Sequence, residues 1–172
     1  MANCISHLFL SPPKVYSLTR LRSEKLIEEG IRLAVPPNHP FARRNTVSLF
    51  EATEEPFIGY SRAEFPSYHL FLKSVFAKVK TKPRIVEEHD SFTGVMAAVE
   101  AGGGVALVSE SFHLSAGNRV KLLRLTPEPK PSVIGIAAPP GPLSPQGEKF
   151  WQCAKEVALE ISATSVAARR RQ

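Results

Sequence analysis

Two segments of this 172-residue chain carry side chains that could hold a small anion. The first, residues 60–67, combines an aromatic ring, a hydroxyl and a guanidinium. The second, residues 90–93, is where a helix is expected to start, with Asp90 or Ser91 as its cap. Ser91 and Thr93 add hydroxyls there to the free backbone N–H groups of a helix N-terminus. Both follow predicted strands, and ligands of open α/β sheets bind beyond the carboxyl ends of strands. These residue types indicate a small-anion pocket, with ordinary helix capping and loop solvation as the alternative.

Other reactive side chains form no comparable pattern. Cys153 falls in a predicted helix without an adjacent base, and no nucleophile elbow is found. The run 87–90 is acidic, but neighbouring strand residues point to opposite faces, so its side chains cannot all converge. The glycines at 102–104 follow a helix and precede a strand, which predicts a turn rather than a phosphate cradle. The histidines lack metal-site spacing: His7, His39, His69, His89 and His113. We therefore expect no enzyme, no metal and no cofactor.

The composition is that of an ordinary globular protein. Hydrophobic residues make up 43% and charged residues 22%, which excludes a disordered chain, a coiled coil and a collagen-like repeat. The net charge of +6 comes from the ends, because residues 1–22 and 169–171 are basic and the body between them is neutral. We expect no direct binding of nucleic acid from this chain. Two distant cysteines, no signal peptide and no membrane span predict a cytoplasmic protein without membrane contact.

Hydrophobic periodicity predicts alternating strands and helices. Ser48 and Glu51 form a capping box at a short helix, and Gly102 has the position of a C′ glycine. Residues 84–108 are predicted to be a strand–helix–strand unit with parallel strands. The pattern predicts an α/β fold with a mixed sheet. The predicted strands are 31–35, 56–60, 84–87, 105–108, 120–125 and 133–137; the predicted helices are 48–53, 66–77, a segment after Ser91, and a long segment from Ser144.

In combination, these segments resemble the effector-binding domain of LysR-type transcriptional regulators. The matching stretches are VPPNHPFA at 35–42, VSL at 47–49 with EPFI at 55–58, and VEAGGGVALVS at 99–109. The resemblance covers about residues 24–160. It implies a type 2 periplasmic-binding-protein-like α/β fold, a small effector such as an organic acid or an amino acid bound between two lobes, and a homo-oligomer.

The resemblance also implies a division of the chain. The family's winged helix-turn-helix and linker helix have no counterpart, so we expect a truncated regulator with one complete lobe and an incomplete second lobe. We expect Phe150, Trp151 and Val157 to leave an apolar surface that favours self-association. The expected parts are an irregular segment at 1–23, which does not resemble the family, a crossing strand at 24–32, effector-binding lobe II at 33–125, the return to partial lobe I at 126–162, and a basic tail at 163–172.

The resemblance implies site residues on effector-binding lobe II alone. Ser61, Ser91 and Thr93 would donate hydrogen bonds to an effector carboxylate. Tyr60 and Phe65 would wall its apolar part, Arg62 would offer a charge, and Gly104 and Val105 would come next to the cleft. The expected function is effector sensing for transcription regulation. Two alternatives stay open: a free-standing small solute-binding protein and an inert gene fragment.

Overall fold

The computed structural model describes residues 21–79 and 81–169, with the backbone alone at Lys78 and 163–169. The chain divides into two compact units, one formed by residues 29–132 and the other by the remaining residues on both sides. Among the described residues, no helix is both long and apolar enough to cross a membrane. The strands are β1 (Arg22–Glu29), β2 (Ile31–Val35), β3 (Thr46–Ser48), β4 (Pro56–Tyr60), β5 (Arg84–His89), β6 (Ala106–Ser109), β7 (Lys121–Thr126) and β8 (Ser132–Ala138).

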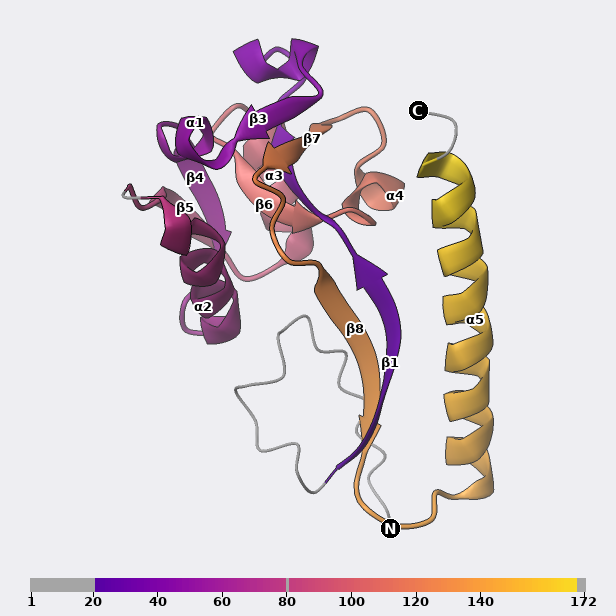
Figure 1. Ribbon diagram of the computed structural model, residues 1–172. Coiled ribbons are helices and arrows are strands. Elements are labelled where there is room, and N and C mark those ends of the chain that lie inside the picture. Colours follow the sequence, from indigo (N-terminus) through magenta and orange to yellow (C-terminus); the bar gives the residue numbers. More distant parts are fainter. Residues whose placement is uncertain (1–20, 80, 170–172) are drawn as a thin grey trace. The chain divides into compact units, whose positions relative to one another are not determined.

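Five α-helices and two short 3₁₀ turns are found among the described residues (Figure 1). The strand predicted at 56–60 is confirmed, as is a helix that starts near residue 91 and ends before Gly102; of the two predicted caps, Ser91 is the one used. The helix at Phe112–Ala116 was not predicted from the sequence, nor were strand β3 and the first 3₁₀ turn. The helices are α1 (Leu49–Thr53), α2 (Pro66–Val75), α3 (Phe92–Glu100), α4 (Phe112–Ala116) and α5 (Pro145–Arg169), and the 3₁₀ turns are η2 (Pro40–Arg43) and η3 (Phe76–Lys78).

The larger unit is built on a mixed sheet in the order β5-β4-β6-β2-β7-β3. Strand β2 runs antiparallel to both β6 and β7, whereas β4 pairs in parallel with β5 and bridges in parallel to β6. Strands β5 and β6 are therefore parallel, as predicted from the strand–helix–strand pattern. They are not neighbours, because β4 lies between them, and the sequence pattern could not reveal an intervening strand.

The sheet is covered on both faces, which explains why its strands read as continuous apolar runs. Alternate residues of β2 enter different cores: Leu33 packs in one, with α1 and α2, and Ala34 in the other, with α3 and α4. Phe57 and Ile58 of β4 divide in the same way, and both are fully buried. Helix α4 contributes Phe112 to the second core, so this short helix is stabilised by packing rather than by a capping side chain.

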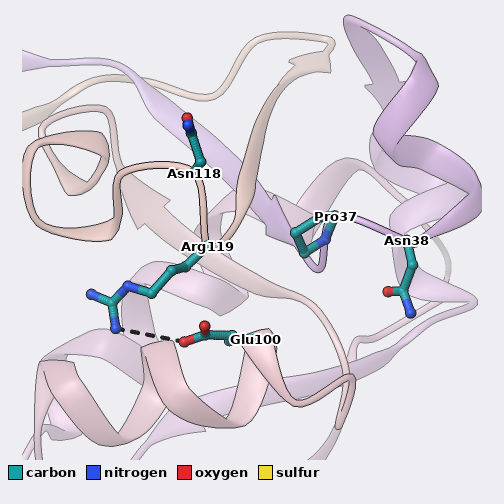
Figure 2. A pocket seen from close by; sticks show the side chains of 5 residues that line it. All are labelled: Pro37, Asn38, Glu100, Asn118 and Arg119. Atoms are coloured by element: carbon teal, nitrogen blue, oxygen red, sulfur yellow. Dashed lines mark ion pairs between the residues drawn. The ribbon is translucent and has the colours of Figure 1, made fainter.

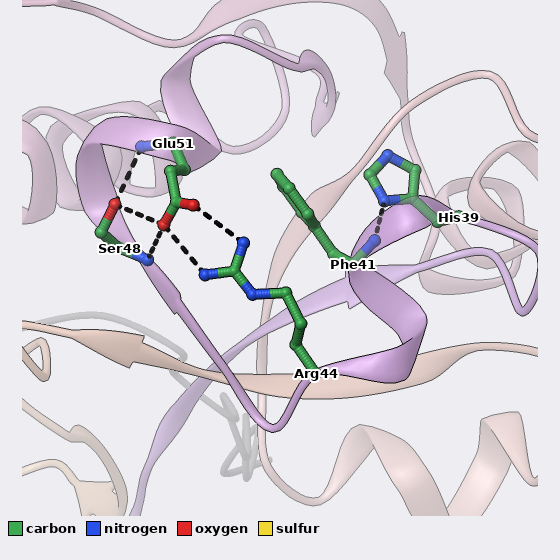
Figure 3. A network of polar contacts seen from close by, with 5 residues as sticks. All are labelled: His39, Phe41, Arg44, Ser48 and Glu51. Carbon is green, nitrogen blue, oxygen red and sulfur yellow. Dashed lines mark hydrogen bonds and ion pairs between the residues drawn. The ribbon is translucent and has the colours of Figure 1, made fainter.

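The predicted capping box at α1 is confirmed and has an additional member (Figure 3). The Glu51 backbone N–H donates to Ser48 Oγ at 3.1 Å, and the Ser48 N–H donates to Glu51 Oε2 at 2.9 Å. Arg44, which follows η2, donates to both carboxylate oxygens of Glu51 at 2.8 and 3.2 Å. The η2 turn is capped by His39, whose Nδ1 accepts from the Phe41 N–H. The short helix is thus anchored at its start by three residues.

The smaller unit consists, within its described part, of β1 and β8 with the long helix α5 (Figure 1). Trp151 is 4% exposed, and its indole Nε1–H donates to Glu24 on β1 at 2.8 Å. The expectation that Trp151 would be exposed is therefore wrong, because β1 supplies a carboxylate partner and the Arg22 guanidinium stacks over the ring. Phe150 and Val157 are exposed as expected, at 53% and 45%.

Candidate functional site

The candidate site forms at the carboxyl ends of β4 and β5, which we call the β4–β5 edge. The two strands are parallel neighbours, and Tyr60 at the end of β4 pairs with His89 at the end of β5. The Ser61 backbone N–H extends this ladder by donating to the His89 carbonyl at 2.7 Å. The loop at 61–65 and the first turn of α3 therefore leave the sheet side by side. This register brings the two segments singled out from the sequence to one place.

The loop after β4 is a compact turn with an aromatic lining. The Phe65 N–H donates to the Ser61 carbonyl at 2.8 Å and closes the turn. The Tyr60 ring lies 5.1 Å from the Phe65 ring and 5.0 Å from the Tyr68 ring, between centroids. Phe65 is 38% exposed, so one ring of this cluster remains open to a ligand. Tyr60 and Phe65 thus lie in one aromatic cluster, and Tyr68 joins them.

The start of α3 carries hydrogen-bonding capacity that the helix does not use. Ser91 is the N-cap, and its Oγ accepts from the Gly94 N–H at 3.2 Å and from the Thr93 hydroxyl at 3.4 Å. A hydroxyl that accepts still has its own proton to donate. The first backbone N–H groups of a helix also have no acceptor within it, and no acidic residue occupies the first turn of α3. An anion placed here would meet donors and the positive end of the helix dipole.

Two residues that the sequence did not single out hold the loop in place. His69, which is 9% exposed, contacts the Tyr60 carbonyl through Nε2 at 2.7 Å. Glu88 lies 3.8 Å from the same imidazole nitrogen and accepts from the Arg62 backbone N–H at 2.9 Å. The Arg62 side chain is itself exposed, at the rim of the loop. The acidic run does divide as expected, because Glu87 pairs with His89 while Glu88 serves the loop.

The two tyrosines remain protonated donors at this edge. Burial raises the pKa of the Tyr60 phenol above its ordinary value. Burial also raises the pKa of the Tyr68 phenol, and the neighbouring Tyr60 adds to that shift. The Tyr68 hydroxyl is buried and has no hydrogen-bond partner among the residues the structure describes. Neither group can serve as a base near neutral pH, so their role is to pack and to donate.

Gly104 and Val105 do not come to the β4–β5 edge. The Val105 N–H donates to the Pro56 carbonyl and the Val105 carbonyl accepts from Ile58, both at 2.8 Å, so these residues lie beside the amino end of β4. Phe57, the β4 residue that bridges to Val105, is about 10 Å along the strand from Tyr60. Gly104 and Val105 are both fully buried. They lie away from the β4–β5 edge because β6 joins β4 near its start.

A hollow of about 510 Å³ lies on the larger unit at the end of α3 (Figure 2). Arg119 and Glu100 form an ion pair across it at 3.5 Å. Arg119 also donates to the Ser115 carbonyl at 2.9 Å, so its guanidinium is already engaged. Pro37 follows the carboxyl end of β2, and β2 runs antiparallel to β6 and therefore to β4. The hollow thus lies at the edge of the sheet where β4 begins, not at the β4–β5 edge. Among the described residues, no group of three or more His, Cys, Asp or Glu side chains could hold a metal ion.

Comparison with known proteins identifies the family to which this sequence is similar. A model of the LysR substrate binding domain matches residues 8–159. The expectation that residues 1–23 lack any family pattern is therefore wrong from residue 8 onward. The uncharacterized HTH-type transcriptional regulator YybE of Bacillus subtilis (strain 168) is 31% identical over 129 residues, which cover 74% of this chain and 43% of that protein. HTH-type transcriptional regulator TtuA of Agrobacterium vitis is 37% identical over 84 residues, 48% of this chain and 27% of that protein. The chain thus spans less than half the length of these relatives.

Solved structures show the same fold. The CcmR regulatory domain of Synechocystis PCC6803 in complex with 2-PG has a TM-score of 0.75 at 18% identity and covers 89% of this chain and 73% of that one. The effector binding domain of QuiR in complex with shikimate has a TM-score of 0.71 at 20% identity over 85% of this chain and 69% of that one. The fold is the α/β fold of type 2 periplasmic-binding-protein-like effector domains. With the family model matched over most of its length, the chain belongs to the LysR substrate-binding domain family.

Proposed function

We propose that this chain senses a small organic acid at the β4–β5 edge, as the effector-binding part of a LysR-type transcriptional regulator. The observation that carries the proposal is the register between Tyr60 and His89, which sets the 61–65 loop beside the first turn of α3. Neighbours of similar fold are in complex with shikimate, 2-PG and benzoate, and shikimate and benzoate are small carboxylates. In this proposal, the chain would serve a longer regulator. That regulator would bind DNA, self-associate and change its DNA binding when the effector binds.

The residue roles follow from the geometry. Ser91 would donate its own hydroxyl proton to a carboxylate at the start of α3, and Thr93 would turn its hydroxyl from Ser91 toward the same carboxylate, together with the first backbone N–H groups of the helix. Ser61 would add a third hydroxyl, and the exposed Arg62 side chain would approach the anion from the rim. The rings of Tyr60 and Phe65 would contact the apolar part of the acid. A ligand with a carboxylate at one end and a ring or short chain at the other suits this arrangement.

The proposal is tested by calorimetric titration with shikimate, benzoate and 2-PG, followed by a wider set of organic acids and amino acids. For any acid that binds, Thr93→Val and Arg62→Ala should each weaken binding by about 10-fold, because each removes a donor to a charged group. Arg119→Ala is the matched control, since it removes a guanidinium at the edge where β4 begins. Unchanged affinity in both site variants, or an equal loss in Arg119→Ala, would place the ligand elsewhere.

A free-standing solute-binding protein is the second candidate, because a similar fold and ligand class would serve it. The two candidates differ in what the effector changes. For a regulator, adding the acid to the longer protein alters its binding to duplex DNA, measured by fluorescence anisotropy. For a solute-binding protein, the acid binds and DNA binding is absent with or without it.

A further inference from the structure

The chain passes between its two units twice, at residues 28–29 and at 132–133. We call 29–32 the first passage and 127–132 the second passage; both belong to the larger unit. Any change in the geometry of one unit against the other must be transmitted through these two stretches of backbone. Side chains that fix them therefore have more influence than an ordinary surface contact.

Arg32 joins the two passages. Its side chain is 9% exposed, and its guanidinium contacts Glu110 at 3.0 Å and Glu128 at 3.2 Å. Its Nη1 also donates to the Ile31 carbonyl at 3.1 Å. Glu128 lies on the second passage, so this ion pair connects segments that are remote in sequence. A buried guanidinium needs such partners, because an unpaired charge out of water is strongly unfavourable.

The first passage is fixed further by the residues that follow β6. The Glu110 N–H donates to the Gly30 carbonyl at 2.8 Å, and the Ser111 hydroxyl donates to the buried Glu29 carboxylate at 2.9 Å. A Cβ on Gly30 would lie 2.8 Å from the Arg32 Nη1 atom. Glycine at the junction of β1 and β2 thus leaves the space that the guanidinium occupies.

The second passage is stiff by composition. Proline at 127, 129 and 131 fixes every second φ angle, so Glu128 is presented by a short semi-rigid stretch. Because this stretch is stiff, an ion pair at Glu128 also restrains the backbone on both sides of it. In a flexible linker, the same ion pair would restrain Glu128 alone. The Glu128 side chain is 64% exposed, which makes this arm of the cluster the one that solvent and salt can reach.

We propose that Arg32, Glu110 and Glu128 form an ionic clamp that holds the two passages at a fixed spacing and so restricts the movement of one unit against the other. Glu110 anchors Arg32 to the larger unit, and Glu128 is the releasable arm. The clamp does not depend on which ligand binds or on whether the β4–β5 edge is the binding site.

The test is the distribution of distances between two spin labels in the full chain, measured by pulsed electron resonance. One label sits on Cys153, the exposed cysteine of α5, and the other on Lys73→Cys in α2, with Cys4 replaced by serine. Glu128→Gln should broaden the distribution by about twofold, because the second passage is released. In the protein that retains Glu128, 1 M NaCl should produce the same broadening, since an exposed carboxylate is screened by salt. The Glu128→Gln protein should not respond to salt.

Glu100→Gln is the matched control, because it breaks the Arg119 ion pair in the same unit without touching a passage. Glu110→Gln is the second clamp variant and should broaden the distribution like Glu128→Gln. Thermal unfolding of each variant reports whether it is folded. If a variant is unfolded, the salt series on the parent protein provides the test instead. An unchanged distribution in Glu128→Gln, or equal broadening in Glu100→Gln, would overturn the clamp.

Discussion

At Glu51, three kinds of donor converge on one carboxylate. The Arg44 guanidinium holds the pKa of Glu51 at about 2, with further contributions from the backbone and hydroxyl of Ser48. A carboxyl group whose pKa is depressed on folding contributes stability above its unfolded value of 4.5, and this contribution is lost as the pH falls through that value toward about 2. The pair thus adds acid sensitivity to an exposed corner of the larger unit.

We expect Glu51→Gln to lower the melting temperature at pH 7, and the gap to the parent protein to close between pH 4.5 and about 2. Thermal unfolding followed by circular dichroism across this range measures the gap. Glu54→Gln, at the other end of the same helix, is the control and should show no such closing gap. A gap for Glu51→Gln that stays constant down to pH 2 would contradict the assignment.

The sequence allowed half of this cluster to be predicted. Ser48 and Glu51 lie three residues apart, so a local rule is sufficient to pair them. Arg44 reaches Glu51 because the η2 turn and strand β3 set its direction, and both elements were missed. At the β4–β5 edge the same holds: Ser91 was one of two caps predicted from the sequence, whereas His69 and Glu88 meet the loop only through the fold.

Among elements, the turn between α3 and β6 shows how one glycine differs from another. Gly102 has φ +84 and open space around it, so it serves as the C′ residue that the sequence predicted. Gly104 has a different function. A Cβ there would lie 2.3 Å from the Pro56 carbonyl oxygen, so the absent side chain permits β6 to join β4.

We expect Gly104→Ala to cost about 3 kcal/mol of stability, because backbone atoms rather than a flexible side chain would have to move. Gly102→Ala, two residues away, should cost about 1 kcal/mol, since only its left-handed backbone conformation is disfavoured. Urea unfolding of both variants gives the comparison. If the two substitutions cost the same, the close approach of β6 to β4 is not what requires Gly104.

Elements with their own start and stop signals were predicted, and elements held by packing were not. Helix α3 has a serine cap, a spaced apolar face and a glycine after its end, and its limits followed from the sequence. Helix α4 has no side-chain cap, and its helical form depends on Phe112 and Ala116 entering a core made by other elements. The order of the strands shows the same limit, because local patterns cannot place β4 between β5 and β6.

At the scale of the whole molecule, the chain contains one tryptophan, and it reports on one unit. Trp151 packs on β1 through the Arg22 guanidinium at 4.6 Å and the Glu24 carboxylate. Its indole lowers the pKa of Glu24, with Lys155 as the next cause. The described sheet of this unit has two strands, and such small sheets are marginally stable.

We expect Trp151 fluorescence to change at lower urea than the exchange of amide protons in β2 and β6, because the smaller unit unfolds first. Glu24→Gln should move the fluorescence transition to still lower urea and leave β2 and β6 unaffected. Glu28→Gln is the matched control on the same strand, since its partner Lys25 does not contact the indole. Coincident transitions in the parent protein would show that the two units unfold together.

The long helix leaves a one-sided apolar stripe exposed. Phe150, Val157 and Ile161 lie seven and four residues apart and are 53%, 45% and 36% exposed, so they share one face. Leu159 is 71% exposed and lies about half a turn around from Phe150. An apolar stripe of this kind favours self-association.

We expect the double variant Phe150→Gln and Val157→Gln to reduce concentration-dependent self-association about 10-fold, measured by sedimentation velocity, because it removes the two most exposed members of the stripe. Leu159→Gln removes a more exposed side chain from the other side of the helix and serves as the control. Equal effects of the two changes, or a parent protein that stays monomeric at every concentration, would contradict a role for the stripe.

Strand β2 comes first in its sheet along the chain, yet it lies at the centre, antiparallel to its neighbours. Leu33 pairs with Leu107 on one side and with Leu123 on the other, so neither partner exists when β2 leaves the ribosome. Pairing across such long stretches slows folding and leaves apolar strands exposed in the meantime. During synthesis, Ile31–Val35 must wait until the chain extends through Thr126. A strand that is buried once folding is complete is therefore exposed to solvent while the rest of its sheet is being synthesised.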